Sequence, residues 1–171
     1  MVFSKIEETK VKICIEKMIS SYFVVPKLDG TNRFILNLKH FNKFVETEHF
    51  KLEDIHSALN MIDPEDYMCR VGLKDAYLSV LIYSEQRKFL RFKFNNVTLQ
   101  FKALPFGLSS SPYIFTKLMK PVVDFLRKIG FRMIVYLDDF LIFGHTRQEC
   151  SNNVKFLIKL LCFLGFIVNL E

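Results

Sequence analysis

The first third of the chain alternates between apolar runs and turn-forming residues, a pattern typical of short helices and hairpins. Apolar side chains recur at helical spacing near the N-terminus, which predicts an amphipathic helix over about the first 20 residues, on Val11, Ile15, Met18 and Ile19. Residues 22–27 and 33–36 are rich in β-branched and aromatic residues and predict two strands. Leu28-Asp29-Gly30-Thr31 between them predicts a hairpin turn.

The middle of the chain predicts one helix and then strands. Residues 52–61 place Leu52, Ile55 and Leu59 on one helical face. Residues 67–73 predict a strand, and 78–83 form a second alternating segment. Basic and aromatic residues then interleave in a predicted β region, on Arg87, Lys88, Phe89, Arg91, Phe92, Lys93, Phe94, Phe101 and Lys102. This pattern suits a nucleic-acid backbone, but strands that face a core on one side alternate in the same way.

The last third predicts two helices and an apolar hairpin. Residues 104–112 are turn formers that end in serines and a proline, so a helix should follow, kink or break near Pro121, and end at Gly130. Residues 131–136 and 140–143 are apolar and predict two strands joined by a tight turn. Residues 153–163 predict a helix that we expect to be buried, because it is apolar nearly all round.

Composition indicates a packed globular chain. Its 171 residues suffice for one domain or for two small lobes that share one core. Hydrophobic residues make up 50% of the chain and phenylalanine alone numbers 19, so disorder is not expected. The net charge of +6 favours an anionic partner such as nucleic acid, although a modest excess of basic residues is also typical of an ordinary surface.

Cysteine spacing and hydropathy bear on the compartment. The 4 cysteines include no C-x-x-C pair, which predicts neither a zinc site nor a disulfide framework and favours a reducing environment. The longest apolar stretch, 156–168, is interrupted by Lys159 and is shorter than the roughly 20 residues that a membrane helix needs. We therefore expect an intracellular protein, cytoplasmic or nuclear, that has no membrane segment and no signal peptide.

Two adjacent carboxylates, Asp138 and Asp139, occupy the tip of the predicted apolar hairpin. Two negative charges about 4 Å apart repel by roughly 4 kcal/mol at an effective dielectric constant of about 20, so the pair suggests a counter-cation. Mg²⁺ is the natural candidate, because it is a hard ion that takes oxygen ligands. A solvated turn is the alternative, since aspartate is common in turns.

Lys27 and Arg33 lie near the tip of the N-terminal hairpin, where they could hold phosphates. An ordinary surface hairpin with two solvated cations explains the pair equally well. Neither residue is decisive alone, so the order of motifs along the chain matters more.

Four motifs occur in order: Val25-Pro26-Lys27-Leu28-Asp29-Gly30, Leu73-Lys74-Asp75-Ala76-Tyr77, Leu104-Pro105-Phe106-Gly107-Leu108-Ser109 and Tyr136-Leu137-Asp138-Asp139. Over residues 15–171 the chain resembles the reverse transcriptase, an RNA-directed DNA polymerase, of a DIRS-like or gypsy-like retrotransposon. The resemblance implies an α+β fold: a right-hand polymerase palm, with an antiparallel sheet backed by helices, and a fingers subdomain. We expect fingers at about 1–46 and 80–110, palm at about 47–79 and 111–171, and no thumb.

The resemblance also implies roles for individual residues. Asp138 and Asp139 match the catalytic and metal-binding aspartates. Lys27 and Arg33 match residues that hold the triphosphate of the incoming dNTP, and Asp75 and Ala76 match positions beside it. Tyr77 matches the aromatic gate that selects deoxynucleotides, and Phe106 and Gly107 match the loop that cradles template and nucleotide. The implied reaction is nucleotidyl transfer to a primer 3′-hydroxyl on an RNA or DNA template by two Mg²⁺ or Mn²⁺ ions.

One departure from the family pattern concerns the metal site. Similar sequences carry an aspartate, shared by both metal ions, at the position of Gly72. Asp75 lies three positions further on, at a distance on the order of 10 Å in extended backbone, so we expect it to stay near the triphosphate. We therefore expect weak metal binding, if any, and an impaired polymerase.

Two other functions remain open at this point. A partner chain that supplies a thumb would complete a working polymerase, because nothing after Glu171 in this sequence could grip a primer. Alternatively, the chain is a non-catalytic nucleic-acid-binding remnant that keeps the basic groove.

Overall fold

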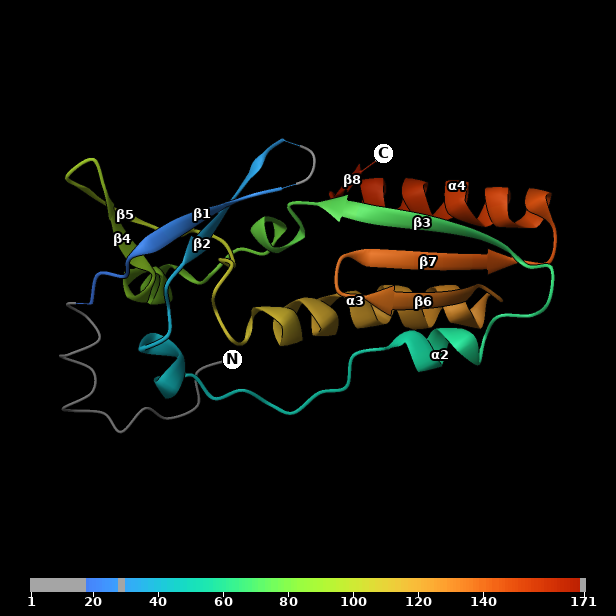
Figure 1. Cartoon of the computed structure of the whole chain (residues 1–171), viewed down its shortest axis with the longest axis horizontal. Helices are drawn as coiled ribbons and strands as arrows, with labels where there is room; N and C mark the ends of the chain where they lie inside the picture. The colour runs from blue at the N-terminus through green and yellow to red at the C-terminus, as the bar shows by residue number, and fades with distance from the viewer. Residues whose placement is uncertain (1–17, 28–29, 170–171) are drawn as a thin grey trace. The chain divides into compact units, whose positions relative to one another are not determined.

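The chain forms two compact units, each assembled from two segments of the sequence. The computed structural model describes residues 18–27 and 30–169. Most of the predicted N-terminal helix, and Leu28 and Asp29 of the predicted turn, lie outside the described residues. The first unit comprises Met1–Glu48 and Val80–Tyr113, and the second comprises His49–Ser79 and Ile114–Glu171. Figure 1 shows the elements of each unit.

The described part of the first unit contains two antiparallel hairpins and two 3-10 helices. Strand β1 (Tyr22–Pro26) pairs with β2 (Asn32–Leu36), and β4 (Arg91–Phe94) pairs with β5 (Val97–Gln100). The 3-10 helices are η1 (Phe41–Phe44) and η3 (Ser84–Phe89). Aromatic rings of the two hairpins pack together, among them Tyr22, Phe34 and Phe92. The two strands predicted at 22–27 and 33–36 are confirmed to within one residue.

The alternating segment 78–83 is not a strand. It starts inside the 3-10 helix η2 (Ala76–Ser79) and continues to a single bridge between Leu81 and Ala103. Arg87, Lys88 and Phe89 likewise lie in η3, so the predicted β region is restricted to β4 and β5. Alternation over so few residues does not distinguish a strand from a 3-10 turn followed by extended chain.

A four-stranded antiparallel sheet, in the order β6-β7-β3-β8, forms the centre of the second unit. Its strands are β3 (Tyr67–Lys74), β6 (Arg132–Tyr136), β7 (Asp139–Gly144) and β8 (Ile167–Asn169). Strands β6 and β7 form the predicted apolar hairpin, and β3 pairs with both β7 and β8. An antiparallel sheet accompanied by helices confirms the α+β fold class.

Helices cover both faces of this sheet. They are α2 (Ile55–Leu59), α3 (Ser111–Lys128) and α4 (Arg147–Phe163). Helix α4 packs along β3 and β7 (Figure 1), where the Cys150 thiol donates to the carbonyl of the fully buried Ile142. On the opposite face Ala58 of α2 packs against Phe143. Burial in this low-dielectric layer also raises the pKa of the Cys150 thiol.

Helix α3 ends where the sequence predicts, at Gly130. The Gly130 N–H donates to the Arg127 carbonyl (3.0 Å) and the Phe131 N–H to the Leu126 carbonyl (3.1 Å), which is a Schellman motif with Gly130 at φ 96°. Pro121 lies inside α3, and the helix is not broken there but continues to Lys128. The helix tolerates Pro121 because packing of its other residues, such as the fully buried Phe115, compensates for one lost backbone hydrogen bond.

Two helix predictions are wrong in their bounds. Helix α2 begins at Ile55 and not at 52, because the Asp54 side chain accepts from the Ser57 N–H (2.9 Å) and caps the helix there. Helix α4 begins at Arg147, six residues before 153, where Thr146 caps the Glu149 N–H. Helix α4 is not buried all round either, since Phe163 is 86% exposed. Among the described helices, none has the length and apolar character to cross a membrane.

Candidate active site

The two adjacent aspartates lie at the turn between β6 and β7. Tyr136 pairs with Asp139, so Leu137 and Asp138 form a two-residue loop and Asp139 is the first residue of β7. Leu137 has a φ of 55°, and a positive φ at the first loop position is the feature of a type II′ hairpin turn. A left-handed backbone costs a non-glycine residue on the order of 1–3 kcal/mol, so the strong β6–β7 pairing holds a strained tip.

Gly72 lies directly beside this tip. It pairs with Asp139 on one side and with Asn169 on the other, in the centre of the sheet. The Leu73 N–H donates to the Asp138 carbonyl at 2.9 Å. A Cβ atom built on Gly72 would lie 3.2 Å from Oδ1 of Asp139. A carboxylate at position 72 would therefore lie beside the Asp139 carboxylate, and glycine supplies no oxygen donor there.

Arg70 occupies part of the space beside the tip. Its Nε and Nη2 donate to Oδ1 of Asp139 at 3.0 and 2.9 Å, and Nη2 also donates to Oδ2 at 3.0 Å. Arg70 and Gly72 share one face of β3 because side chains alternate along a strand. The side chains of Arg70 and Asp139 are 73% and 38% exposed. Sequence reasoning missed this arginine, although its spacing of two residues from Gly72 on a predicted strand was a usable signal. We call Arg70, Gly72, Asp138 and Asp139 the hairpin-tip site.

Asp75, Ala76 and Tyr77 follow the end of β3 in the same unit. Asp75 has a φ of 50° and its carbonyl accepts from the Leu78 N–H (2.8 Å), which turns the chain sharply out of the strand. Ala76 and Tyr77 are buried. The Tyr77 ring meets the Phe115 ring edge-on, with centroids 5.6 Å apart. Packing on α3 therefore fixes the orientation of the tyrosine.

The predicted phosphate-binding cations lie in the first unit. Val25 pairs with Arg33, and Lys27 is two residues beyond Val25, so both cations are on the same face of the β1–β2 hairpin. The Arg33 guanidinium lies over the Phe106 ring, 4.9 Å from its centroid. This cation–π contact brings two of the predicted nucleotide-binding residues together.

Gly107 makes the closest backbone approach in this loop. It has a φ of 104°, and a Cβ atom there would lie 2.0 Å from the Leu36 carbonyl oxygen. The Leu36 N–H donates to the Phe106 carbonyl at 3.0 Å, so the loop is hydrogen-bonded to the end of β2. Glycine is required because any side chain would collide with β2. Gly107 thus permits a close backbone approach between the loop and β2.

The structure thus places the predicted site residues in two groups. The first unit holds Lys27, Arg33, Phe106 and Gly107, and the second holds Asp75, Ala76, Tyr77, Asp138 and Asp139. In the first group Arg33 contacts Phe106. In the second, Asp138 is hydrogen-bonded to Leu73 on β3, the strand that Asp75–Tyr77 follow.

Comparison with known proteins identifies the family. Residues 24–171 match the family model described as reverse transcriptase (RNA-dependent DNA polymerase). The chain belongs to the reverse transcriptase family. It is 25% identical over 140 residues to polyprotein P3 of Commelina yellow mottle virus, and 25% identical over 145 residues to the transposon Tf2-3 polyprotein of Schizosaccharomyces pombe. The matches cover 82% and 85% of this chain but only 7% and 11% of those polyproteins.

Solved reverse transcriptases share its fold. A foamy viral protease-reverse transcriptase in complex with double-stranded DNA superposes with a TM-score of 0.77 at 26% identity, over 89% of this chain and 26% of that one. A foamy viral protease-reverse transcriptase in complex with an RNA/DNA hybrid gives a TM-score of 0.73 at 25% identity, over 89% of this chain and 20% of that one. The chain thus spans about a quarter or less of the length of these solved proteins.

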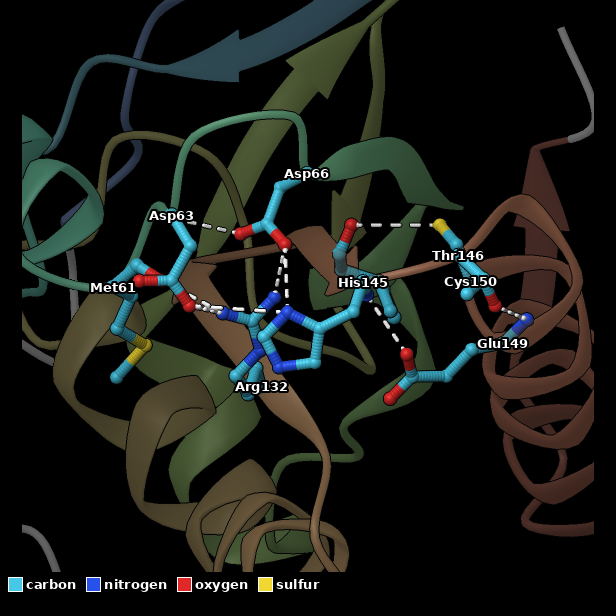
Figure 2. Close-up of polar contacts among 9 residues, drawn as sticks. Met61, Asp63, Asp66, Arg132, His145, Thr146, Glu149 and Cys150 are labelled. Carbon is cyan, nitrogen blue, oxygen red and sulfur yellow. Dashed lines mark hydrogen bonds and ion pairs between the residues drawn. The ribbon is translucent and has the colours of Figure 1, made fainter.

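A second polar cluster of this reverse transcriptase lies at the opposite end of the same sheet. It consists of Asp63, Asp66, Arg132 and His145, which we call the far-end cluster (Figure 2). Arg132 donates from Nη1 to Asp63 (2.5 Å) and from Nη2 to Asp66. Asp66 also accepts from the Asp63 N–H (2.8 Å), and its side chain is only 1% exposed.

Arg132 supplies the positive charge that this cluster needs. The ligand atoms of Asp63, Asp66 and His145 lie within 4.8 Å of one another, a spacing that would suit a metal ion. The guanidinium already binds both carboxylates, however. Its hydrogen bond lowers the pKa of Asp66, and the same contact raises the pKa of Arg132. Sequence reasoning missed this cluster, because no local pattern links residues from three separate segments.

Proposed function

We propose that this chain is the fingers and palm portion of an RNA-directed DNA polymerase that binds nucleotide and primer-template but is impaired in nucleotidyl transfer. The observation that carries the proposal is the position of Gly72 opposite Asp139, where a side chain would lie 3.2 Å from the Asp139 carboxylate. We assign the fingers to the first unit and the palm to the second. Their bounds, Met1–Glu48 with Val80–Tyr113 and His49–Ser79 with Ile114–Glu171, support this assignment.

We propose nucleotide-binding roles for residues of each unit, taken separately. Lys27 and Arg33, on one face of the fingers hairpin, offer positive charge to the triphosphate. Phe106 and Gly107 supply the loop beside them. In the palm, Asp75 and Ala76 lie next to the triphosphate, and Tyr77, held by Phe115, acts as the gate against a ribose 2′-hydroxyl.

The palm residues do not fit a two-ion metal site. Two-metal polymerases hold ions roughly 3.5–4 Å apart between carboxylates on neighbouring strands, to activate the attacking hydroxyl and stabilise the leaving group. Here β7 contributes Asp139 and the loop contributes Asp138, but β3 contributes glycine. Arg70 further neutralises Asp139 with a bidentate contact. At most a single, weakly held Mg²⁺ or Mn²⁺ on Asp138 and Asp139 is consistent with this donor set.

Nucleic acid is the proposed macromolecular partner. The solved foamy viral relatives are complexes with double-stranded DNA and with an RNA/DNA hybrid. The net charge of +6 is compatible with phosphate-dominated binding, in which Lys and Arg release condensed counterions. We therefore propose that the chain binds a primer-template duplex with an affinity that falls steeply as salt is raised.

Primer extension tests the proposal directly. We would compare the chain with its Gly72→Asp variant and with the matched uncharged variant Gly72→Asn, in Mg²⁺ and in Mn²⁺, each with and without a fused primer-gripping thumb. We expect no detectable extension by the chain, extension by Gly72→Asp when the thumb is present, and none by Gly72→Asn. Extension by the unaltered chain would show that Asp138 and Asp139 suffice, and the impairment would be refuted.

A non-catalytic nucleic-acid-binding module is the second candidate. The observation that favours it is the Arg70–Asp139 pair, which reduces the negative charge of the palm without a metal ion. Salt-dependent duplex binding, together with failure of Gly72→Asp to extend a primer even with the thumb, would favour this function over the first.

A further inference from the structure

We propose that Asn42 is a positioning residue that sets the backbone of the loop 105–109 for nucleotide binding. The inference rests on the proposed function, in which Phe106 and Gly107 of this loop contact the incoming nucleotide. Asn42 lies on η1 and is distant from the loop in sequence, yet its side chain is bound to the loop at two points. No motif in the sequence marks it.

Both atoms of the Asn42 amide are used. Nδ2 donates to the Gly107 carbonyl at 2.9 Å, and Oδ1 accepts from the Ser109 N–H at 3.0 Å. The opposite orientation of the amide would place donor against donor and acceptor against acceptor, so the contacts fix which atom is nitrogen. Asn42 therefore bridges two peptide groups of the loop and restrains the residue between them, Leu108.

Every carbonyl from residue 105 to residue 108 is bound to the protein. The Pro105 carbonyl accepts from the buried Ser111 hydroxyl (3.1 Å), and the Phe106 carbonyl accepts from the Leu36 N–H (3.0 Å). The Leu108 carbonyl accepts from the Ser111 N–H (3.1 Å). Asn42 supplies the remaining contact, at Gly107. Asn42 differs from the other donors because its side chain also accepts from a loop N–H, that of Ser109.

The direction of these carbonyls determines the direction of the N–H groups. In a trans peptide the C=O and the N–H point in opposite directions, and no described peptide bond is cis. The Gly107 N–H therefore points away from β2, and the Leu108 N–H points away from Asn42. Successive N–H groups that point out of a loop form a concavity that binds anions. Arg33 over the Phe106 ring adds a cation at the same loop.

The ligand class that fits is an anionic group of a nucleotide, bound by backbone N–H groups beside a guanidinium. Loss of Asn42 frees the 107–108 peptide to rotate, so the direction of the Leu108 N–H is no longer fixed. The loop would stay attached through Leu36 and Ser111, which leaves the fold intact. This separates a positioning role from a purely structural one.

Nucleotide binding by the full chain tests this inference, with the fluorescent probe mant-dATP titrated in Mn²⁺ and displaced by unlabelled dATP. We expect Asn42→Ala to weaken binding by about tenfold, because the freed loop must be ordered again when the nucleotide binds. The two lost hydrogen bonds should also lower the Tm by a few degrees, so the titration is run well below the Tm of the variant. The matched control is Asn37→Ala, whose side chain binds Ser21 in the same unit without touching the loop. We expect it to stay within about twofold of the unaltered chain. Amide ¹⁵N shifts of residues 107–109 should move only in the Asn42 variant.

The outcomes are distinguishable. If the affinity of folded Asn42→Ala is within twofold of that of the unaltered chain, the positioning role is overturned and the proposed function still stands. Absence of displaceable binding by the unaltered chain overturns the proposed function and this inference with it. Should Asn42→Ala fail to fold, Asn42→Asp decides, because it keeps the acceptor for Ser109 and is expected to weaken binding by about threefold. Unchanged affinity of that variant also overturns the role.

Discussion

The two ends of the sheet in the second unit both neutralise aspartate with arginine, but they differ in burial and in backbone strain. At each end an arginine forms ion pairs: Arg132 with Asp63 and Asp66, and Arg70 with Asp139. In the far-end cluster the Arg132 and Asp66 side chains are 25% and 1% exposed, and Asp66 has further partners. In the hairpin-tip site Arg70 is 73% exposed, Leu137 is strained, and Gly72 contributes no side chain.

This difference indicates which end holds the fold together and which end is available for chemistry. Removing one partner of a buried, hydrogen-bonded ion pair is costly, whereas exposed ion pairs contribute little. Backbone strain persists where surrounding structure enforces it, and it clusters at functional sites. The far end is therefore a structural clamp. The hairpin tip is exposed and strained, as we expect of the proposed active site, in which Gly72 supplies no ligand.

The largest effect should come from breaking the clamp. We expect Arg132→Met to lower the Tm by about 5–10 °C, because Asp66 would keep a buried charge without its cation. Arg70→Met is the matched control, since it removes the same charge at the other end, and should lower the Tm by less than about 2 °C. Thermal denaturation followed by circular dichroism measures both. Equal decreases in Tm for the two variants would show that the two ion-pair sites contribute equally to stability.

Acid should weaken the clamp in a defined pH range. Arg132 lowers the pKa of Asp66 below its ordinary value of 3.8. As the pH falls, Asp66 is therefore protonated in the unfolded chain at a higher pH than in the folded chain. The stability that ionised Asp66 contributes is present above pH about 4 and is lost as the pH falls through the pKa of Asp66 in the folded chain. Urea unfolding between pH 5 and about 2 should show a steeper loss for the unaltered chain than for Asp66→Asn. Parallel pH profiles would contradict the assignment.

At the hairpin tip, Gly72→Asp should restore metal binding. A carboxylate there would lie beside Asp139, and three oxygen donors hold a divalent ion better than two. We expect Mn²⁺ affinity to rise by at least about tenfold, measured by electron paramagnetic resonance of free Mn²⁺. Gly72→Asn, which adds the same bulk without the charge, should leave affinity nearly unchanged. A similar rise in both variants would point to a steric cause.

Removal of Arg70 should give a smaller gain. Its guanidinium competes with any cation for both oxygens of Asp139, but the pair is exposed and therefore weak. We expect Arg70→Met to raise Mn²⁺ affinity by about threefold. Lys74→Met is the matched control, because it removes the same charge from the same face of β3. An equal gain in that variant would attribute the effect to net charge alone.

The smallest effect concerns the strained turn. Leu137→Gly relieves a φ of 55°, and glycine's greater entropy in the unfolded chain offsets part of the gain. We expect the free energy of unfolding, measured with urea, to rise by up to about 1 kcal/mol. The loss caused by Arg132→Met should be the same in this variant as in the unaltered chain. Destabilisation would mean that packing of the half-buried Leu137 side chain outweighs the strain.

The sequence by itself determined the fold class, the family and most elements of the sheet. The β6–β7 hairpin follows from two apolar runs with only Leu137 and Asp138 unpaired between them. The end of α3 follows from Gly130, since a left-handed residue is needed there. These features are local, so a short window of sequence contains their physical cause. Helix starts were harder to predict from the sequence. Helix α4 begins six residues before the predicted start at 153, because a single threonine, Thr146, caps it.

Only the tertiary structure decided which side chains meet. Arg70 on Asp139, Arg132 on Asp66 and Asn42 on the 105–109 loop each join residues that are more than 60 positions apart. Their contacts depend on strand register and on the path of connecting segments, which no local pattern specifies. The family resemblance of the sequence implied an acid at the position of Gly72. The fold revealed that an arginine lies beside the gap, because β3 and β7 pair in the register that sets Gly72 against Asp139.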